Sequence, residues 1–480
     1  MLHFVSTSDM RRQESLLAKI RERAFAPVDI ASLVFFRITF GLVMIGEVVA
    51  FRNLIRGAWI QPLFLFKYYG FSWVEPWPGY GLYIHWVLLG LFAALVTAGF
   101  LYRISATLLF LSWSYFFLLD EGRYVNHTYL MCLFAFLLVF VPAHRAFSID
   151  AWLRPKLRAQ TTPVWTIWLL RVQMGFVYFF AGVAKTAPDW LHGEPMRTWL
   201  RHEIHSPLID RFSHAEWTPY VTSYAALLFD LLSAPLLFWR RTRLAMFCLV
   251  VVFHILNSQF FSIGVFPWLA ISASTIFLAP DWPRRVALIF HRGRELPAPA
   301  KAKPPPNCRK QNWVLSFVAI YIAIQALLPL AHFFYPGGIE WTYLEHHFAW
   351  QMLLRRQITT AFFYVTDPNN GKTYQVPLSR CFGPLTISRM GWRPDMVQQF
   401  AQYLAKARLP SGPKPRTAQV RMFVSINGRK PRLFLDPNVD LAAEPHVWGR
   451  PRWLLQIDQP RPPPGQDFSE NFFVTSSEGN

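Results

Sequence analysis

The chain has 480 residues, of which 53% are hydrophobic and only 16% are charged, and its formal net charge is +20. Soluble domains carry about 25% charged residues, so this composition excludes an ordinary soluble protein, and a 17% aromatic content excludes a disordered one. An integral membrane protein with a polar appendage fits these values. Its surplus of Lys and Arg is typical of cytoplasmic loops and does not by itself indicate nucleic-acid binding.

Residues 1–30 are basic, with Leu16, Leu17, Ile20 and Phe25 at roughly helical spacing among the charges. This pattern predicts an amphipathic segment that lies on the cytoplasmic surface of the membrane. A cleaved signal peptide is disfavoured, because the apolar run that follows starts late and is long.

A membrane-spanning helix needs about 20 mostly apolar residues. Nine segments qualify, at 31–51, 80–101, 104–119, 127–143, 163–186, 220–239, 243–257, 260–279 and 312–331. The third, fourth, seventh and eighth are short, so each is either tilted or re-entrant. We therefore expect a polytopic α-helical membrane domain over residues 31–331.

The loops between these segments differ in charge. Arg103, the 145–158 and 240–243 loops and the 281–311 linker are basic, whereas the alternate loops are mixed or acidic, with a weak exception at Arg52, Arg56 and Lys67. The positive-inside rule then places the basic loops and the N-terminus in the cytoplasm. An odd number of spans places the C-terminal part outside the cytoplasm.

Residues 332–458 are predicted to form a β-rich extracytoplasmic domain. The segments 358–366 and 372–376 flank an Asp-Pro-Asn-Asn-Gly turn, and 419–426 and 429–435 flank Asn427-Gly428, so two hairpins are expected. Residues 394–407 have a helical apolar pattern. The Pro-rich and polar residues 459–480 are expected to be a flexible tail.

Lys185 stands at the outer end of the fifth span, behind the small residues Ala181, Gly182 and Ala184. Ionisable groups inside a membrane are costly and usually functional, and small residues let a ligand or another backbone come close. Apolar surroundings favour the uncharged amine, which is then available as a base. The alternative is a lysine whose ammonium simply reaches the outer interface.

Two further polar groups are predicted on the same outer side. Asn126-His127 opens the fourth span, and His254, Asn257, Ser258 and Gln259 lie between the seventh and eighth spans. Their structural alternatives are an interfacial histidine and a hydrogen-bond network between helices. Because Lys185 and both groups fall at the face that carries the C-terminal domain, we expect one shared site.

The four cysteines, Cys132, Cys248, Cys308 and Cys381, form no CxxC pair. The sequence therefore predicts neither a disulfide framework nor a zinc site, and no metal is expected. Gly-rich phosphate loops, HExxH and GxSxG are also missing from the sequence.

Several long segments resemble one family. They are NHTYLMCLFAFLLVF, LRVQMGFVYFFAGVAKTAPDWLHG and FHILNSQFFSIGVF in the membrane part, and FAWQM, VTDPNNGKTYQV and FVSINGRKPRLFLDPNVD in the soluble part. They resemble the vitamin K-dependent gamma-glutamyl carboxylases and their bacterial relatives, the horizontally transferred transmembrane (HTTM) domain proteins. This resemblance implies a bacterial inner-membrane protein.

The resemblance also implies a reaction that uses reduced vitamin K or menaquinone, O2 and CO2. The hydroquinone is deprotonated and oxygenated, the resulting strong base removes a γ-proton from a peptide glutamate, CO2 adds to the carbanion, and the quinone leaves as its epoxide. Lys185 matches the base and His127 the residue that supports carboxylation. The implied quinone-binding residues are Asn126, His254, Asn257, Gln259, Phe261 and Arg171, and the residues on the glutamate-peptide side are Trp350, Met352 and Arg429.

The sequence departs from the animal enzymes in two respects. It has no cysteine where they join the membrane and luminal parts by a disulfide, and they continue further beyond the second hairpin, so we expect much of the propeptide-binding apparatus to be missing. Three functions stay open: a gamma-carboxylase, a quinol epoxidase that carboxylates no peptide, and a non-enzymatic membrane binding protein with the same fold. The implied partners are membrane lipid, a lipid-soluble quinone and a Glu-containing protein or peptide.

Overall fold

A computed structural model of the chain describes residues 17–202, 204, 211–213, 215–290, 308–334, 347–406, 417–447, 449–456, 459–463 and 466–469. Residues 1–16 of the predicted amphipathic segment, most of the predicted basic linker and the end of the predicted tail lie outside these ranges. Residues 17–24 are helical, as the amphipathic pattern predicts, and their position on a membrane surface stays a prediction.

All nine predicted spans form helices, and within the described residues seven are long and apolar enough to cross a membrane. A 21-residue helix is about 31 Å long, which matches the roughly 30 Å hydrocarbon core of a bilayer. The seven are α2 (Ala31–Phe51), α3 (Gly81–Ala98), α4 (Tyr102–Leu119), α7 (Val164–Ala184), α11 (Thr218–Phe238), α12 (Arg243–Phe260) and α15 (Cys308–Leu327). The protein is thus an integral membrane protein.

Two of the four segments that were expected to be short are indeed short helices, α5 (Asn126–Phe140) and α13 (Phe266–Ser274). The other two, α4 and α12, reach 18 residues each. The peripheral elements of the membrane part are α6 (Ile149–Leu153), α8 (Pro188–Leu191), α9 (Met196–His202), α14 (Trp282–Phe290), and the strands β1 (Pro27–Asp29) and β2 (Thr161–Pro163), which pair antiparallel.

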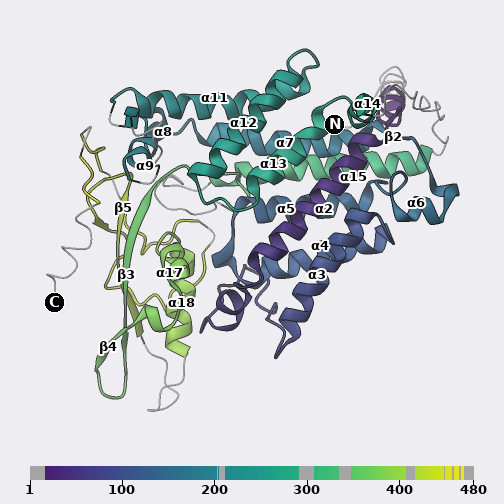
Figure 1. Cartoon of the computed structure of the whole chain (residues 1–480). Helices are drawn as coiled ribbons and strands as arrows, with labels where there is room; N and C mark the ends of the chain where they lie inside the picture. Colours follow the sequence, from purple (N-terminus) through teal and green to yellow (C-terminus); the bar gives the residue numbers. More distant parts are fainter. Residues whose placement is uncertain are drawn as a thin grey trace, which may run out of the picture.

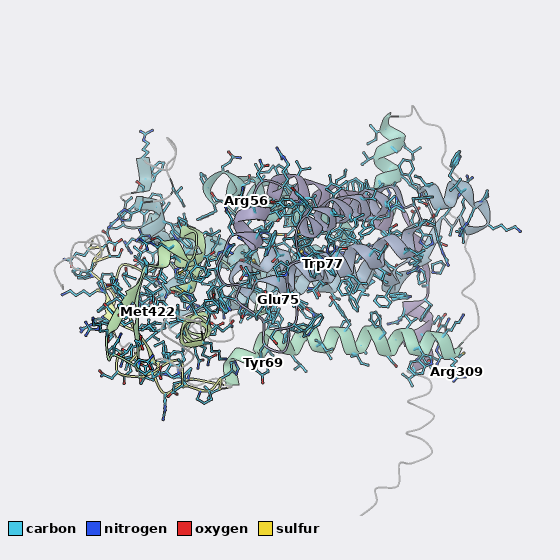
Figure 2. The ribbon with its side chains drawn as sticks, turned by 90° about the horizontal axis from the view of Figure 1, so that it is seen from below. Arg56, Tyr69, Glu75, Trp77, Arg309 and Met422 are labelled. Carbon is cyan, nitrogen blue, oxygen red and sulfur yellow. The ribbon has the colours of Figure 1, made fainter. Side chains whose placement is uncertain are left out.

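The C-terminal strands lie at one end of the helical part, and α6, β2 and α14 lie at the other (Figure 1). The backbone N–H of Asp150 donates to Gly99 O at 3.1 Å, and its carboxylate accepts from Leu101 N at 2.9 Å, so two of the predicted cytoplasmic loops are adjacent. Arg309, at the start of α15, lies far from Met422 in the C-terminal sheet, so α15 runs along the helical part toward that sheet (Figure 2). The orientation of the chain in the membrane stays a prediction.

The C-terminal region contains a four-stranded antiparallel sheet with the order β4-β3-β5-β6. Its elements are β3 (Gln357–Thr366), β4 (Thr373–Val376), α17 (Pro384–Met390), α18 (Pro394–Lys406), β5 (Thr417–Ile426) and β6 (Arg432–Leu433). Both predicted hairpins and the predicted helix are present, and Asn427 and Gly428 have the positive φ values of 50° and 73° that their turn requires. The last strand is shorter than predicted.

Two features of this region differ from the sequence-based expectation. Phe66, from the loop between α2 and α3, is fully buried in the core of the C-terminal region, so a membrane-domain loop completes that core. Part of the segment expected to be a flexible tail also packs on the domain, because Phe468 N donates to Gly428 O at 2.9 Å and Ser469 is buried.

Candidate functional site

A cavity of about 1400 Å³ lies where the membrane helices meet the C-terminal region. Small-molecule sites usually measure roughly 300–1,000 Å³, so this cavity has room for more than one reactant. Its walls come from the 47–61 and 113–128 segments, α7, α9, α11, α12 and the 260–266 turn, together with residues 351–353 and 383–393 of the C-terminal region. Most of the lining is apolar, with aromatic rings from Phe229, Phe253, Phe260, Phe261 and Phe266.

Lys185 directly follows α7 and lines this cavity with only 6% of its surface exposed. Its Nζ lies 2.7 Å from Asp230 Oδ2 on α11, 3.5 Å from Ala181 O and 5.2 Å from the centre of the Trp190 ring. We expected an amine among apolar groups only, and this expectation is corrected by the carboxylate. The amine therefore has a buried, charged partner.

Gly182 explains why the two charged residues meet. A Cβ at this position would lie 2.7 Å from the backbone nitrogen of Leu231, so only glycine lets α11 approach α7 this closely. Leu231 is the neighbour of Asp230, and the close approach brings the carboxylate to the last turn of α7. The small residues before Lys185 thus admit another backbone, which is one of the two uses the sequence suggested.

His127 lies at the start of α5 and lines the same cavity. Within the described residues no group hydrogen-bonds to its ring, and the nearest neighbour across the turn is Gly264, where an added Cβ would lie 3.7 Å from Nε2. Its neighbour Asn126 also lines the cavity and donates from Nδ2 to Gln351 O at 2.8 Å. The asparagine therefore ties the start of α5 to the C-terminal region.

His254 is 2% exposed and is held from α7 and α13. Its Nε2 lies 3.2 Å from the hydroxyl of Tyr178, and that hydroxyl lies 3.0 Å from Ser274 Oγ. Its Nδ1 is buried and has no hydrogen-bond partner among the described residues. Asn257, one turn further along α12, lines the cavity as well.

The structure thus places seven of the predicted site residues on one cavity, namely Lys185, His127, Asn126, His254, Asn257, Phe261 and Met352. It does not bring Gln259, Arg171, Trp350 or Arg429 to the cavity lining. Gln259 is exposed and contacts only Ser258 among the described residues.

Arg171, predicted to bind the quinone, and Trp350, predicted on the glutamate-peptide side, both make structural contacts outside the cavity lining. Arg171 lies 14 residues before Lys185, about 21 Å along α7, and donates to the carbonyls of Ile276 and Leu278 at 2.8 and 2.9 Å. Trp350 is fully buried and packs on Tyr129, with ring centres 5.2 Å apart. Both side chains thus contribute to packing outside the cavity lining.

Arg429 joins the two parts of the chain. Its guanidinium donates to both oxygens of Asp189 at 2.7 and 2.8 Å, while Asn427 and Arg461 donate to the same carboxylate at 2.8 and 3.0 Å. Burial alone would raise the pKa of Asp189, but these donors, with Arg429 foremost, lower it to about 2. This cluster holds α8 against the second hairpin.

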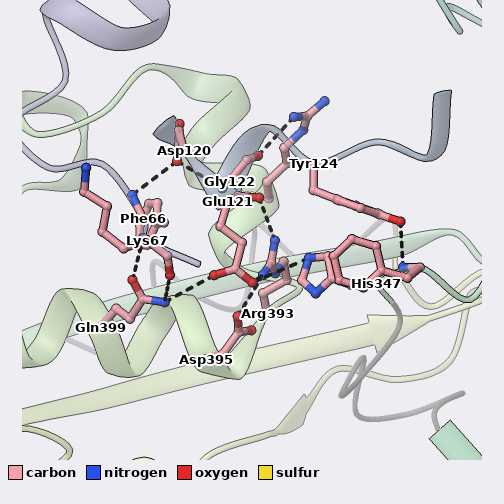
Figure 3. A network of polar contacts seen from close by, with 12 residues as sticks. Phe66, Lys67, Asp120, Glu121, Gly122, Tyr124, His347, Arg393, Asp395 and Gln399 are labelled. Carbon is pink, nitrogen blue, oxygen red and sulfur yellow. Dashed lines mark hydrogen bonds and ion pairs between the residues drawn. The ribbon is translucent and has the colours of Figure 1, made fainter. Parts of the chain in front are cut away.

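A second polar network also joins the membrane part to the C-terminal region (Figure 3). Arg393 binds the Glu121 carboxylate, donates to Glu121 O at 2.9 Å and reaches Asp395 at 2.7 Å. Gln399 exchanges two hydrogen bonds with the backbone of Lys67 at 2.9 and 3.1 Å. Together the two networks dock the C-terminal region on the membrane part, and all four cysteines are free.

Sequence reasoning missed Asp230 and Tyr178. Asp230 is a single acidic residue in the apolar run Leu-Leu-Phe-Asp-Leu-Leu, and that placement was an available signal, because intramembrane carboxylates are rare and usually functional. Tyr178 carried no comparable signal among many aromatic residues. Within the described residues no group of three or more His, Cys, Asp or Glu side chains is arranged to hold a metal ion.

Comparison with known families covers nearly the whole chain. The family model for the HTTM domain matches residues 25–282, more than half of the chain, and the model for the vitamin K-dependent gamma-carboxylase lumenal domain matches residues 310–460. No solved structure matches the chain. The second match begins within α15, and the cavity takes lining residues from both matched regions. The chain therefore belongs to the HTTM-domain family of membrane proteins and carries, after that domain, a vitamin K-dependent gamma-carboxylase lumenal domain.

Proposed function

We propose that this protein is a gamma-carboxylase-like membrane enzyme. Its substrates are a reduced, lipid-soluble naphthoquinone, O2, CO2 and a glutamate side chain of a peptide or protein. Oxygenation of the hydroquinone to its epoxide supplies the strong base that removes the γ-proton of the glutamate, and CO2 then adds at that carbon. Membership of the family supports the general class of this activity.

One observation carries the proposal. The amine of Lys185 and the imidazoles of His127 and His254 line a single, largely apolar cavity at the junction of membrane helices and polar domain. A quinone with an isoprenoid tail arrives from lipid, whereas a peptide arrives from water. A cavity at this junction serves both, and its largely apolar lining protects a strong base from being quenched by water.

The lining fits a naphthoquinol. The rings of Phe260, Phe261 and Phe266 offer flat apolar surface to a bicyclic aromatic ligand. Nδ1 of His254 has no hydrogen-bond partner among the described residues, whereas the other ring nitrogen, Nε2, contacts the hydroxyl of Tyr178. A buried polar atom without a partner costs free energy, and a ligand oxygen would satisfy it. Asn257 offers a further polar contact on the same helix.

Each remaining residue has a distinct role in the proposal. Nζ of Lys185 takes the proton of the substrate hydroxyl, and His127 supports the glutamate during carboxylation. Asn126 fixes the start of α5 through Gln351, which orients His127. Met352 lines the cavity from the C-terminal region, and the proposal assigns it to the peptide side.

The test uses purified full-length protein in lipid nanodiscs with a naphthohydroquinone, O2, labelled bicarbonate and a Glu-containing peptide. Epoxide and labelled peptide formed together support the proposal. Epoxide without labelled peptide identifies a quinol epoxidase instead. If a folded protein forms neither product, the proposed function is overturned in favour of a binding protein.

A further inference from the structure

Asp230 has no role in the chemistry described so far, although it lies in contact with the proposed base. We propose that Asp230 accepts the proton that Lys185 takes from the substrate, so that the two side chains form a proton relay. This inference rests on the proposed function, because it concerns the same hydroxyl proton. Asp230 acts through Lys185 and is a positioning residue in this scheme.

The geometry favours a relay over a simple contact. Nζ and Oδ2 are 2.7 Å apart, and the two side chains are only 7% and 9% exposed. Both residues line the cavity. Among the described residues Lys185 alone hydrogen-bonds to the Asp230 carboxylate. A proton can therefore move within the pair over one short hydrogen bond, and the other hydrogen bond of the amine among the described residues is the longer one to Ala181 O at 3.5 Å.

Packing does not require this pair. A buried ion pair contributes little net stability, because the desolvation of both charges offsets their attraction, and apolar replacements of similar size are often as stable. The α7–α11 contact is already close at Gly182, where the backbone of Leu231 would meet a Cβ at 2.7 Å. Two opposite charges facing a cavity inside a membrane protein therefore point to function.

The proton steps balance as follows. The substrate O–H bond breaks and an N–H bond forms at Lys185 Nζ, while another N–H bond of the same ammonium breaks and an O–H bond forms at Asp230 Oδ2. No electron is transferred. Lys185 is an ammonium before and after the step, so it stays beside the new substrate oxyanion and stabilises it electrostatically. A lone lysine would have to lose its proton to solvent first.

Other titratable groups line the same cavity. They include Glu47 on α2, His127 on α5, Tyr178 on α7 and His254 on α12, while Asp189, Glu194 and Arg197 follow Lys185 in the chain and lie outside the lining. Asp189 is bound by Arg429, and Glu194 lies 3.1 Å from Arg197, so these charges have their own partners. Tyr178 and His254 contact each other at 3.2 Å.

The test measures how the ionisation of a bound, tail-free naphthohydroquinone depends on pH. The absorbance of the ligand reports its ionised form, and the measurement is made under anaerobic conditions. In the relay, ionisation requires the Asp230 carboxylate, and a carboxylate is protonated at far lower pH than an amine. The acid limb of the wild-type profile, where ligand ionisation is lost as the pH falls, should therefore follow protonation of the Asp230 carboxylate. In Asp230→Asn, Lys185 must itself lose a proton, so the limb should move to higher pH, with about a 10²-fold loss of epoxide formation at pH 7.

If Lys185 acts as a base without passing its proton to Asp230, the opposite shift is expected in Asp230→Asn. Asp230 then only favours the ammonium form, so replacing it with Asn would make the amine easier to deprotonate and move the limb to lower pH. A shift to lower pH, or none, overturns the relay, as does a wild-type profile without a carboxylate limb. Asp230→Glu should keep the wild-type limb. Asp281→Asn, which replaces a half-buried aspartate paired with Arg285, is the matched control.

Folding and function are separated by two further measurements. The double variant Lys185→Met with Asp230→Leu should unfold at a temperature close to that of the wild type and should not ionise the ligand. If this variant fails to fold, the pair is structural and the relay is overturned. If the wild type ionises the ligand through a carboxylate limb yet forms no epoxide in air, the relay stands and the proposed function fails.

Discussion

Asp230 and Asp189 are both aspartates bound to a basic side chain, but their oxygens are used differently. Asp189 receives hydrogen bonds on both oxygens from Arg429, Asn427 and Arg461. Asp230 receives one, from Lys185, among the described residues and faces a cavity. A carboxylate that accepts hydrogen bonds on both oxygens fixes two parts of a protein together. A carboxylate that accepts one hydrogen bond and faces a cavity remains available to a ligand or a proton. The Asp189 cluster is thus assigned to the attachment of the C-terminal region, and Asp230 to the reaction at Lys185. Each of the following substitutions should impair one of these two roles and leave the other intact.

The largest effect is expected for Lys185→Ala. Removal of the base should lower epoxide formation by about 10³-fold, within the range for general bases, while the Asp189 cluster keeps the domain docked. External ammonia should partly restore the rate, because a small amine can enter the space left by the side chain. Epoxide is measured by chromatography, with the exposed Lys156→Ala as the control. Full activity in Lys185→Ala would remove this residue from the mechanism.

His127→Ala should lower the formation of carboxylated peptide more than the formation of epoxide. We expect the incorporation of labelled CO2 into peptide to fall by about 10²-fold, with a smaller loss of epoxide. Because no described residue hydrogen-bonds to this ring, the variant should stay folded. The ratio of labelled peptide to epoxide is the measurement, and the exposed His446→Ala serves as the control. An unchanged ratio would contradict the assignment.

Arg429→Ala should weaken the attachment of the C-terminal region and leave epoxide formation unchanged. The partly buried Asp189 would lose both hydrogen bonds from the guanidinium, and although Asn427 and Arg461 remain, the free energy of unfolding should fall by about 2–3 kcal/mol. Denaturant unfolding and proteolysis of the C-terminal region measure this loss, with the exposed Arg432→Ala as the control. If the variant kept its stability and lost epoxide formation, Arg429 would belong to the active site after all.

The smallest effect is a pH dependence of docking. The pKa of Asp189 is about 2 in the folded protein, below its ordinary value of about 3.9. Its contribution to stability is therefore complete above about pH 4 and is lost as the pH falls through 2, by about 2 kcal/mol in total. Comparing the denaturant unfolding of wild type and Asp189→Asn across this range isolates the effect. A difference that instead changes between pH 5 and 8 would contradict it.

The sequence was sufficient to predict the helices, because runs of about 20 apolar residues have few alternatives in a membrane. It was also sufficient for both hairpins, since Asn427-Gly428 specifies a turn with two positive φ values. The position of Lys185, His127 and His254 on one cavity followed from counting spans, because topology alone decides which helix ends meet.

The hydrogen-bond partners of the site residues could not be predicted from the sequence. Asp230 reaches Lys185 only because α11 packs against Gly182, and helix–helix contacts are set by tertiary packing. Arg171 and Trp350 lie in segments that resemble the family, yet a position in a segment does not give the direction of a side chain. The carbonyls of Ile276 and Leu278 attract the guanidinium away from the cavity.

The central claim is that the cavity at Lys185 binds the reduced naphthoquinone with a hydroxyl against the amine. Cryo-electron microscopy of the protein in nanodiscs with a naphthohydroquinone, kept anaerobic, tests it most directly. We predict ligand density beside Phe260 and Phe266, with one hydroxyl oxygen within about 3.2 Å of Lys185 Nζ. Density at another place in the protein, with this cavity filled only by lipid or water, would contradict the account.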